Sequence, residues 1–268
     1  METMTWQTES LDLDAYLLRI GHPRPEASVE ALYSLHAAHV RTIPFENVDV
    51  VLGTHPGIEF DAIQSKLVGR QRGGYCYEHA LLFAAVLEAL GFEVERRVAR
   101  VQPHRPGPRT HMLLLVRIDG QDFLADVGFG AGMLHPMPLK DGAVVDQAGW
   151  DHKLTAAGEL WTLSKQTPDG WVPMHASDNE PQLLIDYKVY HQYISTSPDS
   201  PFSTKLVVMR LDEGISRRLV GDQLTIEYAD GRTTQRTVAP DEINAVLKDL
   251  DVVLNAEEVD RLRLVLGS

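Results

Sequence analysis

The residue with the clearest chemical potential is Cys76, the single cysteine of the chain. It follows Gly73-Gly74, which permit a tight turn, and it begins a run rich in Ala, Leu and Glu that predicts a helix up to Leu90. At the first positions of a helix, unpaired N–H groups and the helix dipole favour a thiolate. A thiolate is the nucleophile that acyl transfer requires, whereas an isolated intracellular cysteine is more often a small buried apolar residue. A base near the sulfur would decide between these two interpretations.

Two histidines are candidates for that base. His79 is closest in sequence, but it lies three residues along the same predicted helix, and a helical histidine is more often a surface or packing residue. His111 begins an apolar run that predicts a strand, and a second strand follows it directly. We therefore favour His111.

A carboxylate stands in a suitable register opposite His111. If Asp119-Gly120 form a two-residue hairpin turn, Leu113 faces Asp126, and His111 shares the face of Leu113. Asp126 is then a diagonal neighbour of His111, at roughly 7–8 Å between backbones, which side chains can bridge. A carboxylate so placed fixes the tautomer of an imidazole and stabilises its cation.

These residues together fill three roles: Cys76 as nucleophile, His111 as base and Asp126 as the group that orients the base. A histidine and an aspartate on one strand face are more often a structural pair when no nucleophile is near. The contact between the helix start and the hairpin is therefore a hypothesis of the sequence analysis.

The elements that must position these side chains change character along the chain. Up to Gly91 the apolar spacing, caps and breakers predict helices at residues 11–20, 29–40, 61–67 and 76–90, with His36 on the apolar face of the second. Beyond Gly91 the pattern predicts strands at 94–101, 111–118, 121–127, 160–164 and 171–174. Tight turns are expected at Asp-Gly pairs 119–120, 169–170 and 230–231. A helix at 181–193, a polar loop at 195–200, strands at 205–211 and 224–228, and two terminal helices, one from about residue 241 and one capped by Asn255, complete the prediction.

The length and composition limit the class of protein. A chain of 268 residues, 44% hydrophobic and 24% charged, is typical of a globular protein with two or three subdomains that share an interface. The best apolar run, Leu81 to Phe92, falls short of the roughly 18 residues that span a bilayer and is interrupted by Glu88. The N-terminus has no basic stretch before an apolar core, so we expect neither a membrane span nor a secretory signal.

The cysteine count and the charge limit the partners. One cysteine excludes an intramolecular disulfide and suits a reducing cytoplasm, which is where we expect the protein. A formal charge of −13 repels phosphate backbones, so nucleic-acid binding is not expected. Self-association into a homo-oligomer stays open.

At this point the chain resembles the arylamine N-acetyltransferase family, and the resemblance covers nearly its whole length. The matching motifs, in the order of the family, are Ile43-Pro44-Phe45-Glu46-Asn47, Arg72-Gly73-Gly74-Tyr75-Cys76-Tyr77-Glu78, Thr110-His111-Met112, Asp126-Val127-Gly128-Phe129-Gly130 and the segment Ser195 to Phe202. Each motif alone is weak, but their combination is highly specific.

The resemblance implies an α+β fold in three parts with a papain-like Cys-His-Asp triad. These parts would be an N-terminal helical bundle at residues 1–91 carrying the nucleophile, a central β-barrel at 92–203 carrying His111 and Asp126, and a C-terminal α/β lid at 204–268. It also implies ping-pong chemistry without a metal, in which Cys76 takes an acetyl group from acetyl-CoA and passes it to an arylamine or arylhydrazine, as in xenobiotic metabolism.

The resemblance further implies which residues surround the reacting atoms. Thr110, Gly128, Phe129 and Gly130 would lie beside coenzyme A, because glycines permit close backbone approach. The aromatic acceptor would bind among Phe45, Tyr77, Phe129 and Phe202, although each of these rings is about as often a core residue. Glu46 and Arg72 would form an ion pair that supports the turn before Cys76. The alternative is a solvated pair on the surface, which would contribute little to stability.

The chain departs from the family pattern at Ala80, where family members usually carry Asn. Two other functions fit the same motifs. One is an amide synthase that closes a macrolactam from a carrier-bound acyl chain, and the other is a catalytically silent protein that binds CoA or an aromatic ligand.

Overall fold

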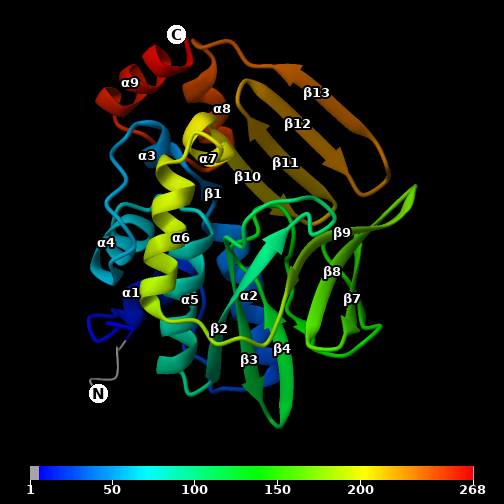
Figure 1. Cartoon of the computed structure of the whole chain (residues 1–268). Helices are drawn as coiled ribbons and strands as arrows, with labels where there is room; N and C mark the ends of the chain where they lie inside the picture. The colour runs from blue at the N-terminus through cyan, green and yellow to red at the C-terminus, as the bar shows by residue number, and fades with distance from the viewer. Residues whose placement is uncertain (1–5, 268) are drawn as a thin grey trace.

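The computed structural model describes residues 6–267, so the first residues of the N-terminal segment, where no secretory signal is expected, lie outside the described part. Helices and two antiparallel sheets make a mixed α/β fold (Figure 1). The helices of the first third lie on one side, an eight-stranded sheet lies beside them, and a five-stranded sheet with the two terminal helices covers one end. Within residues 6–267, no helix is both long and apolar enough to cross a membrane.

The first third of the chain is helical, as predicted. Its helices are α1 (Leu13–Ile20), α2 (Val29–Thr42), α3 (Val48–Val51), α4 (Phe60–Gln64), the π-helical turn η1 (Ser65–Gly69) and α5 (Cys76–Ala89). Side chains of Asp12 and Ser28 cap the first two helices by accepting backbone N–H groups. The helix expected at residues 61–67 is instead divided between α4 and η1, where Arg70 N–H bonds to the carbonyl of Ser65.

Helix α5 forms the centre of the largest core. All of its residues from Cys76 to Leu87 are buried. It packs against α4 and against strands β2 (Glu93–Val101) and β3 (His111–Ile118). A helix that is apolar on all sides needs neighbours on all sides, and this arrangement anchors the first residue of α5 rigidly.

The eight-stranded sheet is barrel-like and nearly closed. Its strand order is β5-β4-β3-β2-β9-β8-β7-β6. Besides β2 and β3 it contains β4 (Gln121–Ala125), β5 (Met137–Pro138), β6 (Val144–Asp146), β7 (Asp151–Ala157), β8 (Leu160–Thr167) and β9 (Gly170–Ser177). The predicted register of the hairpin between β3 and β4 is confirmed, since the ladder runs from Ile118 opposite Gln121 to Leu114 opposite Ala125.

The five-stranded sheet connects the two ends of the chain. Its order is β1-β10-β11-β12-β13, with β1 (Phe45–Glu46), β10 (Val207–Asp212), β11 (Ile215–Val220), β12 (Gln223–Tyr228) and β13 (Thr233–Thr237). Strand β1 comes from the helical third, and Glu46 N–H also donates to the carbonyl of Gly74 at 2.7 Å. The sheet is thereby tied directly to the turn before Cys76.

The remaining helices complete the fold. They are α6 (Leu184–Thr196) and α7 (Pro201–Thr204), which follow the eight-stranded sheet, and α8 (Ile243–Asp249) and α9 (Ala256–Leu266), which end the described chain. Asn255 caps α9 as predicted, because its side chain accepts the N–H of Glu258. Residues of α8 and α9 pack with β10 and β11 in a second apolar core.

Several details differ from the sequence prediction. Strands β1, β5, β6, β7, β11 and β13 and helices α3 and α7 were not predicted, because their short or polar sequences carry little periodicity. The turn expected at Asp169-Gly170 lies one residue earlier, since Gly170 pairs with Thr167 as the first residue of β9. The division into parts at residues 1–91, 92–203 and 204–268 stays a prediction.

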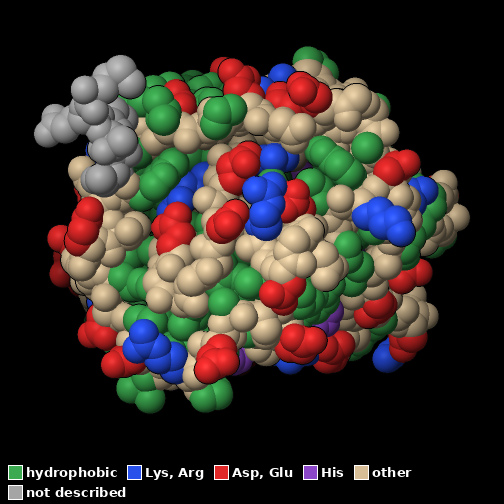
Figure 2. Space-filling view, turned by 90° about the horizontal axis from the view of Figure 1, so that it is seen from below, with side chains coloured by type: hydrophobic (Ala, Val, Ile, Leu, Met, Phe, Trp, Pro, Cys, Tyr) green, Lys and Arg blue, Asp and Glu red, His purple; other side chains and the backbone are tan. Residues whose placement is uncertain are grey.

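Figure 2 shows one face of the molecule, on which Asp and Glu side chains are spread widely while Lys and Arg side chains occur in small separate groups. This distribution agrees with the formal charge of −13. The face therefore has no continuous basic surface of the kind that a phosphate backbone requires.

Candidate active site

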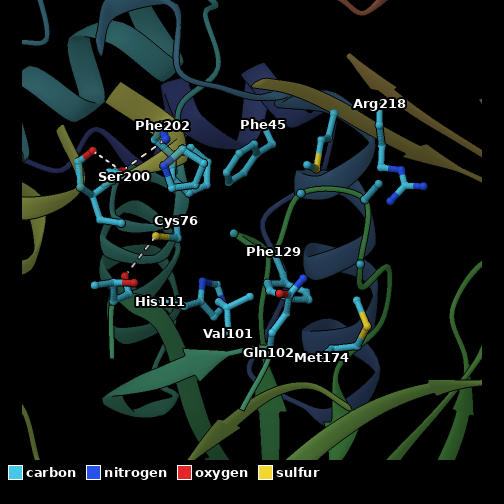
Figure 3. A pocket seen from close by; sticks show the side chains of 18 of the residues that line it. Phe45, Cys76, Val101, Gln102, His111, Phe129, Met174, Ser200, Phe202 and Arg218 are labelled. Atoms are coloured by element: carbon cyan, nitrogen blue, oxygen red, sulfur yellow. Dashed lines mark hydrogen bonds between the residues drawn. The ribbon is translucent and has the colours of Figure 1, made fainter. Parts of the chain in front are cut away.

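Cys76 is the first residue of α5, and its side chain faces a cavity (Figure 3). The preceding residue, Tyr75, donates its N–H to the carboxylate of Glu78 at 3.1 Å, which closes the first helical turn. Cys76 is 7% exposed, so its sulfur is neither sealed in the core nor open to bulk water. This position leaves the thiol under the field of the helix N-terminus.

A close approach of two backbones brings the segment after β4 against the cysteine. A Cβ atom added at Gly128 would lie 2.9 Å from the Cα of Cys76, which only glycine avoids. This contact places the loop that contains Phe129 beside the sulfur, and the carbonyl of Thr110, the residue before β3, lies 3.9 Å from Sγ.

His111 and Asp126 form a short buried pair. The Nε2 of His111 lies 2.7 Å from Oδ2 of Asp126, and the two side chains are 5% and 0% exposed. Burial alone would lower the pKa of His111, but the charge and the hydrogen bond of Asp126, together with the neighbouring Cys76, outweigh it and raise the pKa to about 10. Burial would raise the pKa of Asp126, yet His111 and a second histidine, His175, hold it well below its usual range.

Because Nε2 of His111 is engaged with Asp126, its other ring nitrogen, Nδ1, is the one available to Cys76. Cys76 lies close enough to His111 to raise its pKa, while the sulfur also contacts the carbonyl of Thr110 at 3.9 Å. The sulfur, the imidazole and the carboxylate therefore lie together at one site. The structure brings together the three residues that the sequence placed in these roles.

His36, on α2, supports this pair from behind. The backbone N–H of Asp126 donates to Nε2 of His36 at 3.1 Å, and Nδ1 of His36 donates to the carbonyl of Leu134 at 2.9 Å. Burial lowers the pKa of His36 to about 4, so it stays neutral and keeps this one tautomer. The only signal in the sequence was a histidine on the apolar face of a predicted helix.

His79, the other histidine considered as a base for Cys76, is engaged elsewhere through both ring nitrogens. Its Nε2 donates to the carbonyl of Gly74 at 3.0 Å, and its Nδ1 receives the Nε2–H of His39 at 2.8 Å. Both rings are fully buried, and burial lowers the pKa of each. His79 therefore supports the turn before Cys76, as a packing residue of the kind that the sequence analysis preferred.

A buried network of charges lies beneath that turn. Arg72 contacts Glu46 at 2.8 Å and Asp49 at 3.3 Å, and Lys66 contacts Glu78 at 2.9 Å and Asp49 at 3.1 Å. The Glu46 and Arg72 side chains are 0% and 1% exposed, so their pair is not a solvated surface pair. Removing one member of such a network leaves a buried charge without a partner.

The cavity has a volume of about 450 Å³ and opens directly on the sulfur. Cys76, His111, Thr110, Gly128, Phe129 and Gly130 all line it, as do Phe45 and Phe202. In Figure 3 the rings of Phe45 and Phe202 lie together beside Cys76, with centroids 5.9 Å apart, and Phe129 lies across from them. A space of this size, with apolar rings at a reactive sulfur, can hold a flat apolar ligand.

Tyr77 differs from the other aromatic residues expected in the pocket. It is fully buried and does not line the cavity, because its hydroxyl donates to the carbonyl of Thr110 and its ring packs on Tyr75 and Tyr187. Tyr77 therefore holds the segment directly before His111 rather than a ligand. Ala80, the departure from the motif pattern noted above, is also buried.

One group among residues 6–267 has the composition of a metal site. His111, Asp126 and His175 each offer one ligand atom, and these atoms lie within 4.8 Å of one another. The Nε2 atoms of both histidines approach the same carboxylate oxygen, at 2.7 Å for His111 and 3.2 Å for His175. His175 had no signal in the sequence, because the strand predicted at 171–174 ended before it, whereas β9 extends to Ser177.

Comparisons with known proteins agree with the motifs. A family model described as N-acetyltransferase matches residues 28–259. The arylamine N-acetyltransferase of Mycolicibacterium smegmatis is 38% identical over 261 residues, which cover 94% of this chain and 93% of the relative. The arylamine N-acetyltransferase of Escherichia coli K12 is 32% identical over 269 residues, 96% of this chain and 95% of the relative.

Solved structures are similar over nearly the whole chain. The arylamine N-acetyltransferase of Mycobacterium abscessus superposes with a TM-score of 0.94 at 35% identity, covering 100% of this chain and 99% of the other. The Mycobacterium marinum arylamine N-acetyltransferase in complex with CoA has a TM-score of 0.88 at 31% identity, covering 95% of this chain and 98% of the other.

Proposed function

The chain belongs to the N-acetyltransferase family, whose members in M. smegmatis and E. coli are arylamine N-acetyltransferases. From this premise we propose that it acetylates arylamines and arylhydrazines with acetyl-CoA through an acetyl thioester on Cys76. One observation carries the proposal. A cysteine at a helix N-terminus faces a cavity beside an imidazole whose far nitrogen lies 2.7 Å from the carboxylate of Asp126.

We assign the first half of the reaction to the formation of the thioester. His111 takes the thiol proton of Cys76 on Nδ1, and the thiolate attacks the carbonyl carbon of acetyl-CoA. The bond between that carbon and the CoA sulfur then breaks, and the imidazolium of His111 returns its proton to the departing CoA thiolate. A pKa near 10 keeps His111 protonated at neutral pH once it has accepted the proton.

The second half transfers the acetyl group in a ping-pong sequence. After CoA leaves, the amine nitrogen of the acceptor attacks the thioester, and the Cys76 sulfur is the leaving group. The proton of the amine passes to His111. Asp126 keeps His111 in one tautomer throughout, because its ionised carboxylate accepts the Nε2–H and cannot donate.

Coenzyme A and the acceptor would share the cavity at Cys76 in turn. Thr110, Gly128, Phe129 and Gly130 are the residues that we assign to CoA, because they line the cavity next to the sulfur. The relative from M. marinum is known in complex with CoA, which supports a CoA-binding role in this fold.

The acceptor would bind among Phe45, Phe129 and Phe202, since aromatic rings favour offset or edge contacts with a flat amine. The cavity also takes Met209 from the five-stranded sheet. This supports the proposed division into a helical bundle, a barrel and a C-terminal lid, because each part would contribute to one site. A thiol that must stay reduced also supports a cytoplasmic location.

Intact-mass spectrometry tests the proposal. Acetyl-CoA should add one acetyl group to the protein, and addition of an aniline or a hydrazine should remove it and yield the acetylated amine. The variant Cys76→Ala, which has no nucleophilic atom at this position, serves as the control and should carry no acetyl group.

Three outcomes contradict the proposal. CoA binding without an adduct favours the silent binding protein. An adduct formed only from a carrier-bound acyl chain, with a cyclised product, favours the macrolactam synthase. An adduct that persists in Cys76→Ala places the nucleophile elsewhere.

A further inference from the structure

The carboxylate of Asp126 has a second imidazole beside it. His175, in strand β9, places Nε2 at 3.2 Å from Oδ2 of Asp126, the same oxygen that lies 2.7 Å from His111. The side chains of His175 and Asp126 are both fully buried. The other carboxylate oxygen, Oδ1, makes no hydrogen bond within residues 6–267.

His175 is neutral and has one proton to donate. Burial lowers its pKa, and this effect exceeds the opposite influence of Asp126. A neutral imidazole carries a single N–H, and the charge of Asp126 draws that proton to Nε2. Neither nitrogen of His175 makes a hydrogen bond of regular geometry within residues 6–267, so the 3.2 Å contact of Nε2 with Oδ2 of Asp126 is the contact through which this proton can be donated.

The barrel-like sheet holds His175 in this place. Its backbone pairs with Val101 of β2 and with Leu163 of β8. Its ring stands edge-on to Phe129 with centroids 4.9 Å apart, and it lies 5.3 Å from the ring of His111. Strand β9 thereby places a donor behind a carboxylate that follows β4.

We propose that His175 is a positioning residue for the transfer reaction: its Nε2–H donates to the Asp126 oxygen that also receives His111, and so fixes the orientation of the carboxylate and weakens its hold on the imidazolium proton. This inference rests on the proposed function. A carboxylate that accepts two donors is a weaker base than one that accepts a single donor. His111 can then return its proton to the departing CoA thiolate more readily.

The titratable groups around Asp126 and its two neighbouring imidazoles come from several elements. They are His36 from α2, Cys76 from α5, His111 from β3, Asp126 after β4, His152 from β7 and His175 from β9. Burial lowers the pKa of His36 and that of His152 to about 4, so neither changes charge near neutral pH. His175, whose pKa is also lowered, keeps its charge there as well, so the alkaline pH dependence of this group belongs to His111.

Two variants of similar length distinguish the loss of the hydrogen-bond donor from the loss of packing. Gln and Met have the same length, but only His175→Gln keeps an N–H where the Nε2 of the imidazole lies. In His175→Met we expect single-turnover acetylation of Cys76 to fall about tenfold, as loss of one hydrogen bond to a charged group predicts. In His175→Gln we expect a fall of less than about threefold.

A second measurement, the alkaline pKa of His111, depends on the donor at position 175 and not on the stability of the fold. The rate of alkylation of Cys76 by iodoacetamide against pH reports the alkaline pKa at which the imidazolium of His111 loses its proton. That pKa should rise in His175→Met, because Asp126 becomes a stronger base, and should stay near the wild-type value in His175→Gln. This assay needs neither acetyl-CoA nor an amine, so it tests the inference even if the proposed function fails.

A third measurement uses the unaltered protein. Nitrogen-15 NMR of the histidines should show His175 as a neutral Nε2–H tautomer across neutral pH. Equal losses in the Gln and Met variants, an unmoved alkaline pKa in His175→Met, or an Nδ1–H tautomer in the wild type would each overturn the proposal.

Discussion

The substitution Asp126→Asn is the most direct test of the electrostatics of the site, because it removes one charge and almost no volume. Asp126 is fully buried, and its Oδ2 lies 2.7 Å from Nε2 of His111. An Asn amide can accept the Nε2–H of His111 through its oxygen, but it can equally donate through its nitrogen and stabilise the wrong tautomer. The variant therefore changes both the charge and the tautomer of the base.

The structure supplies the magnitude. The pKa of His111 is raised to about 10 from an ordinary value of 6.5, a difference of 3.5 pKa units that corresponds to roughly 5 kcal/mol at about 1.4 kcal/mol for each unit. Burial opposes this rise, and Asp126 is the largest contributor in its favour. Without Asp126 the pKa of His111 should fall below 6.5, so the ring is mostly neutral at pH 7.

The assay is the second-order rate of alkylation of Cys76 by iodoacetamide between pH 5 and 10, combined with single-turnover acetylation. In the wild type, the imidazolium should keep the alkylation rate high across neutral pH. In Asp126→Asn the rate at pH 7 should fall by an order of magnitude or more, and acetylation should fall by about 10³–10⁴-fold, as for an Asp→Asn change in other triads.

The same variant has a defined effect on stability. The contribution of His111, whose pKa is raised on folding, is complete below its unfolded value of 6.5 and is lost as the pH rises through about 10. The contribution of Asp126, whose pKa is lowered, is present above its unfolded value of 3.8 and is lost as the pH falls. The difference in free energy of unfolding between wild type and variant should therefore be largest between about pH 4 and 6.5 and should shrink towards pH 10.

The matched control is Asp122→Asn, the same change on the same hairpin. Asp122 pairs with Arg117 at 2.7 Å on the surface, so its loss should leave the alkylation profile unchanged. A folded Asp126→Asn protein whose alkylation profile and acetylation rate lie within about threefold of the wild type would refute the assignment of the base.

Three further predictions concern the surroundings of the site. Gly73→Ala places a Cβ 2.0 Å from the carbonyl oxygen of Pro44, so thermal unfolding should show a loss of at least about 1–3 kcal/mol, and an unchanged melting temperature would contradict the close approach. Arg72→Met leaves buried carboxylates without their partner and should cost about 3–5 kcal/mol in denaturant unfolding, whereas the exposed control Arg232→Met should not change stability measurably. Phe202→Ala should raise the KM for an aromatic acceptor while the rate of single-turnover acetylation by acetyl-CoA stays within about threefold, and equal effects on both steps would remove Phe202 from the acceptor side of the cavity.

The sequence predicted those parts of the fold whose signals are local. Helix α5 follows from an Ala- and Leu-rich run after two glycines, and the hairpin of β3 and β4 follows from Asp119-Gly120 between two apolar runs. The register of that hairpin depends only on the turn, because facing pairs are counted outward from it. For this reason a carboxylate could be placed beside His111 before any coordinates were known.

The sequence did not predict the shorter strands or the buried support of the site. Strand β6 has three residues and β13 is exposed throughout, so neither carries an apolar period. The contacts of Asp126 with His36 and His175 join residues that lie 90 and 49 positions away along the chain. No local pattern records such a contact, because each histidine taken alone is also compatible with simple packing.

By itself, the sequence determined the identity of the nucleophile, its place at the start of a helix, and the pairing of His111 with Asp126 across one hairpin. Only the tertiary structure decided that this hairpin meets the helix start, that Tyr77 supports a strand instead of lining the cavity, and that the carboxylate stands between two imidazoles. The physical reason is the distance along the chain over which each effect acts. Helix caps and hairpin registers are set by residues a few positions apart, whereas the pKa of a buried group depends on every charge and dipole that folding packs around it.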